Sequence, residues 1–317
     1  MHDVAIVLVS HSEVRWLRPC LTSIFAHVGK CSADVVVVCN GNDGSAELIE
    51  HELPAARVIR CENHGFAHGC NTGLRACDAR YALLQNVDTE VRSGTFADLV
   101  AALDERPEVG AAGVVQVAPG GELLPTMRNF PGVTRVLAEA LGSERWPTRS
   151  ARLGERVLDP HKYGGEQACD WISGSFLAVR REALEAVGLL DERFFLYSEE
   201  LDLCLRLKQA GWEIRHLPVM TIVHDAYRGM ENPRLEAQGA YARRQFAGKH
   251  FSAPRRLAFD AALALGYAIR SVLPLGGSRS AARRRAARAS LGVVLGTKPP
   301  PFEELTRTPP VGDGGNA

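Results

Sequence analysis

Three groups of residues in this 317-residue chain have side chains suited to chemistry on a charged ligand. The first is the turn Asn-Val-Asp-Thr-Glu at 86–90, in which Asp88 follows a predicted strand at 81–84. A hard divalent cation that bridges a diphosphate takes one or two carboxylates and leaves its other positions to phosphate oxygens and water. Asp88 fits this role, although an acidic residue in such a turn is usually a turn former or a helix cap.

The second group is a glycine-rich segment, residues 62–73, with the sequence ENHGFAHGCNTG. Each of three glycines in a nascent helix costs about 1 kcal/mol relative to alanine. We therefore expect a ligand or a strand to lie tight against this backbone. The glycine order differs from the dinucleotide-binding pattern G-x-G-x-x-G. His64 and His68 lie four residues apart and could ligate a metal, but a solvent-exposed pair is the commoner outcome.

The third group is the run FFLYSEELD at 194–202. Ser198 is the predicted N-cap of a helix and places Glu199, Glu200 and Asp202 in its first turn. Acids in this position complement the helix dipole by about 0.3–1 kcal/mol each. A positioned carboxylate can also deprotonate a hydroxyl as a general base. His224, after a predicted strand at 219–223, would complete an oxygen and nitrogen ligand set with Asp88.

Alternating strands and helices must position these groups. Apolar runs at 4–9, 35–38, 58–60 and 81–84 predict strands, and the segments between them have the spacing of helices with one buried face. This order predicts a mostly parallel sheet covered on both faces, with ligands at the carboxyl ends of its strands. A further strand is expected at 111–117, then an irregular excursion from Pro119 to about Glu166.

Charge is unevenly distributed, although the net charge of the whole chain is zero. Residues 241–298 hold twelve Lys or Arg and one acid, Asp260, so this segment carries +11 and the remainder −11. A basic segment of this kind suggests a polyanionic partner, either a membrane surface or a phosphorylated acceptor. A solvated helix face or a subunit contact, such as a homodimer, explains it equally well. We expect no nucleic-acid partner.

Cysteine usage and hydropathy indicate the compartment. None of the eight cysteines forms a C-x-x-C pair, which favours reduced thiols in a cytosolic protein. The N-terminus lacks the basic region and cleavage site of a signal peptide. The apolar stretch 257–273 contains Asp260 and Arg270 and is too short and too charged to span a bilayer. We therefore expect a cytoplasmic protein that could contact the inner face of the membrane through its basic segment.

Five segments together carry a family resemblance: IVLVSHS at 6–12, ENHGFAHGCNTG at 62–73, NVDTE at 86–90, WISGSFLAVRR at 171–181 and LDERFFLYSEELDLCLR at 190–206. In order and spacing they resemble the motifs of the family 2 glycosyltransferases of GT-A fold, most closely their rhamnosyltransferase-like branch. The matching stretches run from Ile6 to Glu90 and from Trp171 to His224, with weaker similarity to about Phe251.

The resemblance implies an α/β fold: a GT-A (Rossmann-like), mostly parallel central sheet flanked by helices, with a helical basic C-terminal extension. The chain is then expected to divide into a nucleotide-sugar-binding half at 1–117 and an acceptor-binding and catalytic half at 118–230 of the same domain. The helical basic extension follows at 231–298, and a disordered tail at 299–317.

The resemblance also implies roles for individual residues. The Glu199–Glu200 pair would hold the catalytic base, and Asp88 would bind Mg²⁺ or Mn²⁺ with help from His224. The implied donor-binding residues are Ser10, Asn40, Asn63, Gly65, Phe66, Ala67, Asn71, Asn86 and Asp88. The implied acceptor-binding residues are Trp171, Gly174, Ser175 and Tyr197.

The implied activity is an inverting transfer of a sugar from a nucleoside diphosphate to a saccharide or lipid-linked saccharide, with Glu200 as general base. The donor would be dTDP-rhamnose, with a UDP-hexose as the alternative. Two positions depart from the family pattern. Cys39 stands where an aspartate accepts a hydrogen bond from the pyrimidine, and a thiol is a poor substitute. Glu200 stands where the base is an aspartate, and a misplacement of about 1 Å can cost ~100-fold in rate. A catalytically impaired sugar-nucleotide-binding protein is therefore a second hypothesis.

Overall fold

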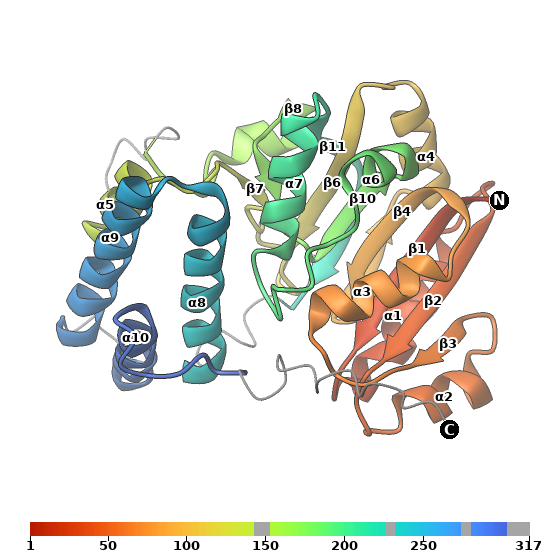
Figure 1. The fold of residues 1–317 in the computed structure, drawn as a ribbon. Coiled ribbons are helices and arrows are strands. Elements are labelled where there is room, and N and C mark those ends of the chain that lie inside the picture. The colour runs from red at the N-terminus through yellow and green to blue at the C-terminus, as the bar shows by residue number, and fades with distance from the viewer. Residues whose placement is uncertain (143–152, 226–231, 274–279, 303–317) are drawn as a thin grey trace, which may run out of the picture.

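The computed structural model describes residues 1–142, 153–225, 232–273 and 280–302. Its first half alternates strands and helices as predicted (Figure 1). The elements are β1 (His2–Ser10), α1 (Val14–Ala26), β2 (Ala33–Cys39), α2 (Ser45–Glu52), β3 (Arg57–Arg60), α3 (Phe66–Arg75), β4 (Ala79–Asn86), β5 (Thr89–Ser93), α4 (Phe96–Asp104) and β6 (Val109–Val117).

The second half is less regular at first and then mainly helical. It comprises β7 (Met127–Arg128), α5 (Val133–Ala140), the 3₁₀ helix η2 (Pro160–Gly164), β8 (Gln167–Ala168), β9 (Trp171–Ile172), β10 (Phe176–Arg180), α6 (Arg181–Val187), α7 (Glu199–Gln209), β11 (Glu213–His224), α8 (Pro233–His250), α9 (Ala253–Val272) and α10 (Ser280–Val294). The short helix α5 lies in the stretch predicted to be irregular, while residues 143–152 of that stretch lie outside the described residues.

The central sheet has the strand order β3-β2-β1-β4-β10-β6-β11-β5, with β8 paired to β11. Strands β3, β2, β1 and β4 are mutually parallel, and β6 is parallel to β11. Strand β10 runs antiparallel to β4 and β6, and β5 runs antiparallel to β11. The prediction of an α/β, mostly parallel sheet is confirmed. The carboxyl ends of β1, β2, β3 and β4 meet at one edge, as parallel strands require.

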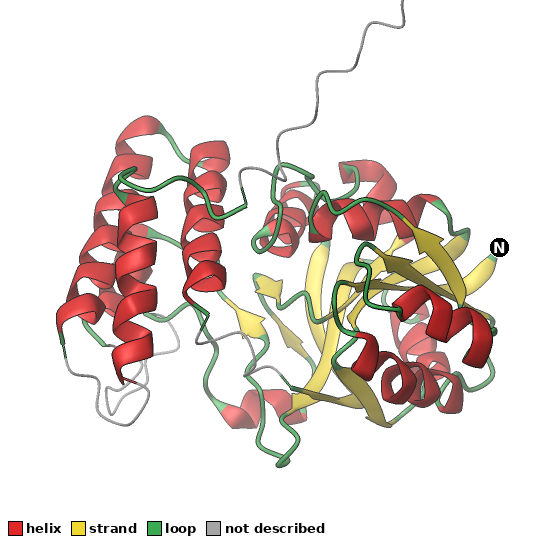
Figure 2. Cartoon of the chain, turned by 90° about the horizontal axis from the view of Figure 1, so that it is seen from below, coloured by secondary structure: helices red, strands yellow, loops and turns green. Residues whose placement is uncertain are grey.

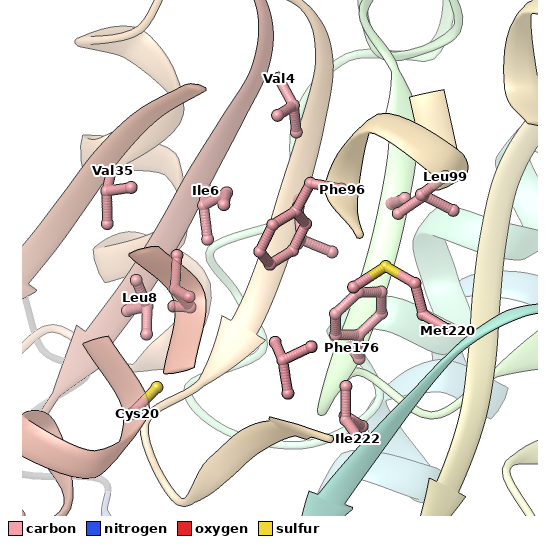
Figure 3. Close-up of a cluster of buried hydrophobic side chains, with 14 of the residues drawn as sticks. Val4, Ile6, Leu8, Cys20, Val35, Phe96, Leu99, Phe176, Met220 and Ile222 are labelled. Atoms are coloured by element: carbon pink, nitrogen blue, oxygen red, sulfur yellow. The ribbon is translucent and has the colours of Figure 1, made fainter. Parts of the chain in front are cut away.

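Two apolar layers enclose this sheet, because successive side chains of a strand point to opposite faces. Ile6 and Leu8 of β1 pack with Leu17 and Leu21 of α1 in one layer, which also contains Phe96 of α4 (Figure 3). The other layer joins Val7 and Val9 of β1 to residues of α3, α6 and α7. Continuous apolar runs such as 4–9 are therefore buried on both sides, as expected for parallel strands.

The C-terminal extension forms a helical unit beside the sheet (Figures 1 and 2). Helices α8, α9 and α10 pack with α5 around a separate small apolar core. This packing explains why α5 forms a helix. With eight residues, α5 is too short to be stable alone and is stabilised by its contacts with the other helices. Arg283, Arg285 and Arg288 of α10 are exposed. No helix in the described parts of the chain combines the length and hydropathy needed to cross a bilayer.

Buried charge holds this unit to the sheet domain. The Asp202 side chain of α7 is fully buried and accepts hydrogen bonds from Arg206 Nε at 2.8 Å and His250 Nε2 at 2.7 Å. Lys249 Nζ lies 2.6 Å from the same carboxylate. Asp202, one of the three acids in the first turn of α7, therefore connects α7 to the end of α8.

A second contact joins the chain after α10 to the sheet domain. The ring of Phe302 stacks on Phe195 at 4.9 Å between centroids, and the guanidinium of Arg234 lies 4.2 Å from the Phe302 ring. Arg234 also donates two hydrogen bonds, of 2.7 and 2.9 Å, to the carbonyl of Pro301. Pro301 and Phe302 fall in the segment predicted as a disordered tail, yet they are packed; residues 303–317 lie outside the described residues.

Candidate active site

The β4–β5 turn carries Asp88, and it lies beside the end of β11. Strand β5 pairs with β11 so that Thr89 is opposite His224. As a result His224 Nε2 lies 3.5 Å from Asp88 Oδ1, and both side chains are largely buried. The amide of Asp225 donates to the Asp88 carbonyl at 3.2 Å, which fixes the two backbones together. The structure thus brings together the two residues predicted as an oxygen and nitrogen ligand set.

This pair fits a divalent cation that binds mainly to its substrate. The described residues contain no cluster of three or more His, Cys, Asp or Glu side chains arranged to hold a metal. A cation at Asp88 and His224 would take most of its ligands from phosphate oxygens and water, which is the mode that Mg²⁺ prefers.

A third ionisable side chain near this pair was not predicted. Glu13 precedes α1, directly after the loop at the end of β1, and its carboxyl group is half-buried. Burial raises the pKa of Glu13 to about 7, and the negative charge of Asp88 adds to the shift. Its place after the first strand was a usable signal, because ligands collect at this edge of such sheets.

A cleft of about 580 Å³ opens at the ends of β1, β2 and β3. Its lining includes Asn40 and Asn63, both predicted as donor-binding, with the Asn40 Nδ2 3.4 Å from the Asn63 Oδ1. The remaining lining residues are His11, Gly41, Asn42, Arg60, Cys61 and Glu62, none of which was predicted. Asp88 and Glu200 do not belong to its lining.

Cys39 lies at the end of β2, next to this cleft. Its side chain is buried, and burial raises the pKa of the thiol to about 12. The group is therefore a neutral thiol, without the negative charge that an aspartate would place here. Asn40 has the polar side chain at this end of β2, and its Oδ1 lies 3.2 Å from His11 Nδ1.

The glycines of the 62–73 segment allow close approach of backbone to its neighbours. Gly65 has a φ of +103°, and a Cβ there would collide with the carbonyl of Phe195, the oxygen that accepts a 2.6 Å hydrogen bond from Phe66 N. A Cβ at Gly69 would lie 2.9 Å from Val9 Cγ1, and one at Gly73 would collide with Val7. The tight neighbour expected from these glycines is thus strand β1, together with the Phe195 loop.

Several polar side chains of this segment make internal bonds. The buried Asn71 donates to Leu190 O and to Glu192 Oε1, each at 2.8 Å, and accepts from Leu190 N at 3.1 Å. His68 bonds to Glu192 at 2.8 Å, whereas His64 pairs with Glu62. Ser10, also predicted as donor-binding, is buried with its hydroxyl 2.9 Å from that of Ser45. Asn71 and His68 therefore fasten α3 to the loop before α7.

Glu199 and Glu200 begin α7; the side chain of Glu199 is buried and that of Glu200 is half-buried. The Glu200 Oε1 lies 3.4 Å from the amide of Gly174, while the Oε2 of each glutamate is sealed from solvent without a hydrogen-bond partner. Burial raises the pKa of Glu200, with opposing contributions from backbone amides and Arg128. Burial raises the pKa of Glu199 well above its usual range, and the charge of Glu200 adds to the shift.

The turn into α7 differs from the predicted cap. Tyr197 and Ser198 have φ values of 69° and 67°, and the Ser198 side chain makes no capping hydrogen bond. Ser198 is the N-cap residue, as predicted, and the three acids lie in the first turn, but its left-handed backbone leaves the serine side chain without a capping hydrogen bond. Such backbone strain in non-glycine residues concentrates at functional sites. Tyr197 remains 37% exposed beside the two glutamates.

Two backbone contacts connect the Asp88 turn to Glu200. Asn86 N, in the strand that leads to Asp88, donates to Ser175 O at 3.0 Å. The neighbouring Gly174 N is the group that faces Glu200 Oε1. Residues predicted for the metal, the acceptor and the base are thereby held along one short segment, 173–175. The Ser175 hydroxyl itself is buried and bonds to Gln116 at 2.9 Å.

Trp171, predicted to border the acceptor, is mostly buried at the start of this segment. Its indole Nε1 donates to Asn129 O at 3.0 Å, and the Arg128 guanidinium lies 5.5 Å from the ring centroid. Arg128 was not predicted, because a two-residue strand such as β7 has no recognisable periodicity.

Comparison with known proteins identifies the family of the chain. The sequence model described as "Glycosyltransferase like family 2" matches residues 2–250. The chain belongs to glycosyltransferase family 2. This glycosyltransferase is 29% identical over 240 residues to the N-acetylglucosaminyl-diphospho-decaprenol L-rhamnosyltransferase of Mycobacterium tuberculosis, covering 71% of the chain and 76% of that protein. The predicted rhamnosyltransferase-like resemblance is confirmed.

Solved structures share the fold of this glycosyltransferase. A mannosyltransferase from Pyrobaculum calidifontis in complex with GDP-Man and Mn²⁺ matches with a TM-score of 0.54 at 18% identity, over 96% of this chain and 84% of that one. GalNAc-T7 with UDP, GalNAc and Mn²⁺ matches with a TM-score of 0.59 at 16% identity, over 93% of this chain and 56% of that one. The GT-A architecture is thus confirmed.

Proposed function

We propose that this glycosyltransferase moves rhamnose from dTDP-rhamnose to a hydroxyl of a lipid-linked saccharide, with inversion at the anomeric carbon. A UDP-hexose is the alternative donor, since uracil and thymine differ only by a methyl group and present the same hydrogen-bonding edge. The observation that carries the proposal is the pair of contacts, Asn86–Ser175 and Gly174–Glu200, that joins the Asp88 turn to a half-buried carboxylate whose Oε2 has no hydrogen-bond partner.

The reaction would be a single displacement. Glu200 accepts the proton of the acceptor hydroxyl, and the oxygen forms a bond to the anomeric carbon. The bond from that carbon to the diphosphate oxygen breaks, and the nucleoside diphosphate leaves with the electron pair. Burial raises the pKa of Glu200, and an upward shift strengthens this carboxylate as a proton acceptor.

Asp88 and His224 would hold a divalent cation, Mg²⁺ or Mn²⁺, on the departing diphosphate. When bound, this ion would offset the charge that develops on the leaving group. The cleft next to Asn40 and Asn63 would receive the nucleoside, because it lies at the same strand edge and is large enough for a base and a ribose.

The acceptor would be membrane-anchored, and the basic extension would meet the membrane. Arg283, Arg285 and Arg288 are exposed on α10, and Val272 and Leu273 at the end of α9 are 75% and 50% exposed. Basic side chains near apolar ones favour an anionic lipid surface. Co-sedimentation with vesicles containing phosphatidylglycerol, but not with purely phosphatidylcholine vesicles, is the expected result; equal binding to both would contradict it.

Turnover with a donor panel tests the proposed reaction. We would measure release of nucleoside diphosphate from dTDP-rhamnose, UDP-glucose, UDP-galactose and GDP-mannose, with Mn²⁺, Mg²⁺ or EDTA. EDTA should stop turnover, and Asp88→Asn should lower kcat/KM by about 100-fold or more, as expected for loss of several kcal/mol of charge stabilisation. Glu90→Gln is the matched control, since Glu90 lies in the same turn but is exposed. Full activity of Asp88→Asn would refute the proposal.

A further inference from the structure

Arg128 is a half-buried arginine that lacks a counter-ion among the described residues. Its Nε is sealed from solvent and has no hydrogen-bond partner, and its guanidinium makes no ion pair with a described carboxylate. By contrast, Arg206 and Arg243 each bind a carboxylate directly. Burial lowers the pKa of Arg128, but a guanidinium stays protonated in proteins. A buried charge without a partner is costly, and such a group invites an anionic ligand.

The guanidinium is held in place by its surroundings. Arg128 is opposite Trp171 in the β7–β9 pair, and the two side chains stack at 5.5 Å. Trp171 is anchored through its indole nitrogen to Asn129 O, and the Asn129 amide group donates to Gly154 O at 2.9 Å. The amide of Phe130 donates to Asp170 at 2.8 Å. Because both strands are pinned on either side of Arg128, its charge is positioned and does not swing freely.

The residues around Arg128 include more arginines than glutamates. Among the described residues this group contains four arginines, Arg128, Arg135, Arg156 and Arg243, and two glutamates, Glu139 and Glu155. Glu155 is paired with Arg243, and its charge acts on Arg128 without an ion pair between the two. The other acid that acts on Arg128 is Glu200, whose carboxylate faces the amide of Gly174. The charge of Arg128 thus acts on the proposed base without contacting it directly.

The position of Arg128 separates it from the proposed donor-diphosphate site. The strand of Arg128 contacts the 171–175 segment at Ser173, whose amide donates to Thr126 O at 3.1 Å. The Asp88 turn contacts the same segment at Ser175, through Asn86. The strand of Arg128 and the proposed cation-binding turn of Asp88 therefore adjoin different points of one segment, and Glu200 contacts that segment at Gly174, between them.

We infer that Arg128 is an acceptor-side anion site, which binds a phosphate oxygen of the diphosphate that links the acceptor sugar to its carrier lipid. This inference rests on the proposed function and names the acceptor class: a sugar diphospholipid rather than a neutral glycan. A phosphate held at Arg128 places the acceptor sugar over Trp171 with a hydroxyl toward Glu200. The planar guanidinium suits this role, because it binds phosphate oxygens in a bidentate manner.

Calorimetric binding of two matched acceptor probes tests the inference. One probe is N-acetylglucosamine joined through a diphosphate to citronellol, and the other is the octyl glycoside of N-acetylglucosamine, which has no phosphate. Arg128→Gln should weaken binding of the first probe by about 10-fold or more, the usual effect of losing a charge-assisted hydrogen bond. The second probe should change by less than about 2-fold, because it has no group that pairs with the charge. Arg128→Lys should keep part of the affinity for the first probe, because lysine retains the positive charge but cannot bind a phosphate in a bidentate manner.

Controls separate this inference from a general loss of charge or packing. Arg92→Gln removes an exposed arginine of β5 and should leave both affinities unchanged. Equal weakening of both probes by Arg128→Gln, or unchanged affinity for the diphosphate probe, would overturn the inference. Glu200→Gln should abolish turnover yet still bind the diphosphate probe. If Glu200→Gln kept its turnover, the proposed base would be wrong while the binding results for Arg128 still stood.

Discussion

The carboxylate of Glu200 rests directly against Gly174, whose amide lies 3.4 Å from Oε1 and whose missing side chain leaves the space that the glutamate fills. A Cβ at Gly174 would stand 3.3 Å from Glu200 Cγ and 3.4 Å from its Cδ. Such contacts are tight enough to displace the carboxylate by a few tenths of an ångström.

Gly174→Ala is therefore expected to reduce catalysis without unfolding the protein. We expect kcat to fall by about 10-fold, because a 1 Å misplacement costs ~100-fold and the shift here is smaller. Donor affinity, measured by calorimetry, should stay within about 2-fold, since the displaced group does not bind the donor. Gly132→Ala is the control, because a Cβ at Gly132 meets no atom within 4 Å. A normal kcat in Gly174→Ala would mean that the position of Glu200 does not limit the rate.

The two adjacent glutamates should respond differently to removal of charge. Burial raises the pKa of Glu199 well above its usual range and so favours its neutral form, and Glu199→Gln, which is also neutral, should keep most activity. Glu200→Gln should lower kcat by about 10²–10⁴-fold, the usual range for a general base. In the wild type, kcat/KM should rise with pH through a pKa above the ordinary ~4.3 of a glutamate. An inactive Glu199→Gln beside an active Glu200→Gln would reverse the assignment.

The raised pKa of Glu199 also predicts how the free energy of unfolding changes with pH. The folded-state pKa of Glu199 is raised, so the folded protein keeps a proton that the unfolded chain releases. Its contribution to the free energy of unfolding is therefore fully present below the unfolded pKa and is lost as pH rises through the folded one. Glu199→Gln should remove this loss and unfold at higher urea concentration than the wild type at pH 8, with a smaller difference at pH 4. A Glu199→Gln protein that gained nothing at pH 8 would contradict the buried, protonated assignment.

Alanine substitutions at Gly65 and Gly44 should show how much backbone strain and how much steric contact each contribute to the loss of stability. Both have positive φ, +103° and +81°, but only at Gly65 would a Cβ collide with backbone, that of Phe195. Gly44→Ala should cost about 1–2 kcal/mol in the free energy of unfolding, from the left-handed backbone alone. Gly65→Ala should cost about 1–3 kcal/mol more from overpacking, and it should weaken donor binding by disturbing the Phe66–Phe195 hydrogen bond. Urea denaturation measures the costs, and equal values for both variants would show that the Phe195 loop gives way freely.

Asp202 should matter for stability rather than chemistry. Burial opposes its ionisation, but the bonds from His250 and Lys249 and the charge of Arg206 together lower its pKa. Stability from this group is therefore present above the unfolded pKa of about 3.9 and lost as pH falls below it. Asp202→Asn should cost about 3–5 kcal/mol at pH 7, because Arg206 and Lys249 lose the carboxylate that pairs with them. Asp78→Asn, at an exposed position, should cost less than about 0.5 kcal/mol; an equally small loss for Asp202→Asn would show that the cluster is not structural.

The sequence predicted the strands and helices that can be recognised from the residue types within one segment. Continuous apolar runs such as 4–9 and 35–38 became central parallel strands, and the glycine-rich segment became a helix pressed on β1. Asp88 and His224 could be paired in advance because each follows a strand, and strand ends share an edge.

Features that depend on distant partners could not be predicted. Helix α5 exists because α9 covers it, and the stacking of Arg128 on Trp171 depends on pairing between two-residue strands. The left-handed backbone at Ser198 leaves no trace in residue type, since serine is also the preferred N-cap. Glu13 becomes unusual only through burial beside Asp88.

The stacking of Phe302 on Phe195 has a practical consequence for anyone who shortens the chain. The carbonyl of Phe195 accepts a hydrogen bond from the amide of Phe66 at the start of α3. Phe195 therefore contacts α3 through its backbone and the segment after α10 through its ring. A chain cut after Lys298 would strip away the aromatic cover and the Pro301 carbonyl that engages Arg234. Truncations and fusions at this end are therefore safer beyond Phe302 than at the visible end of the last helix.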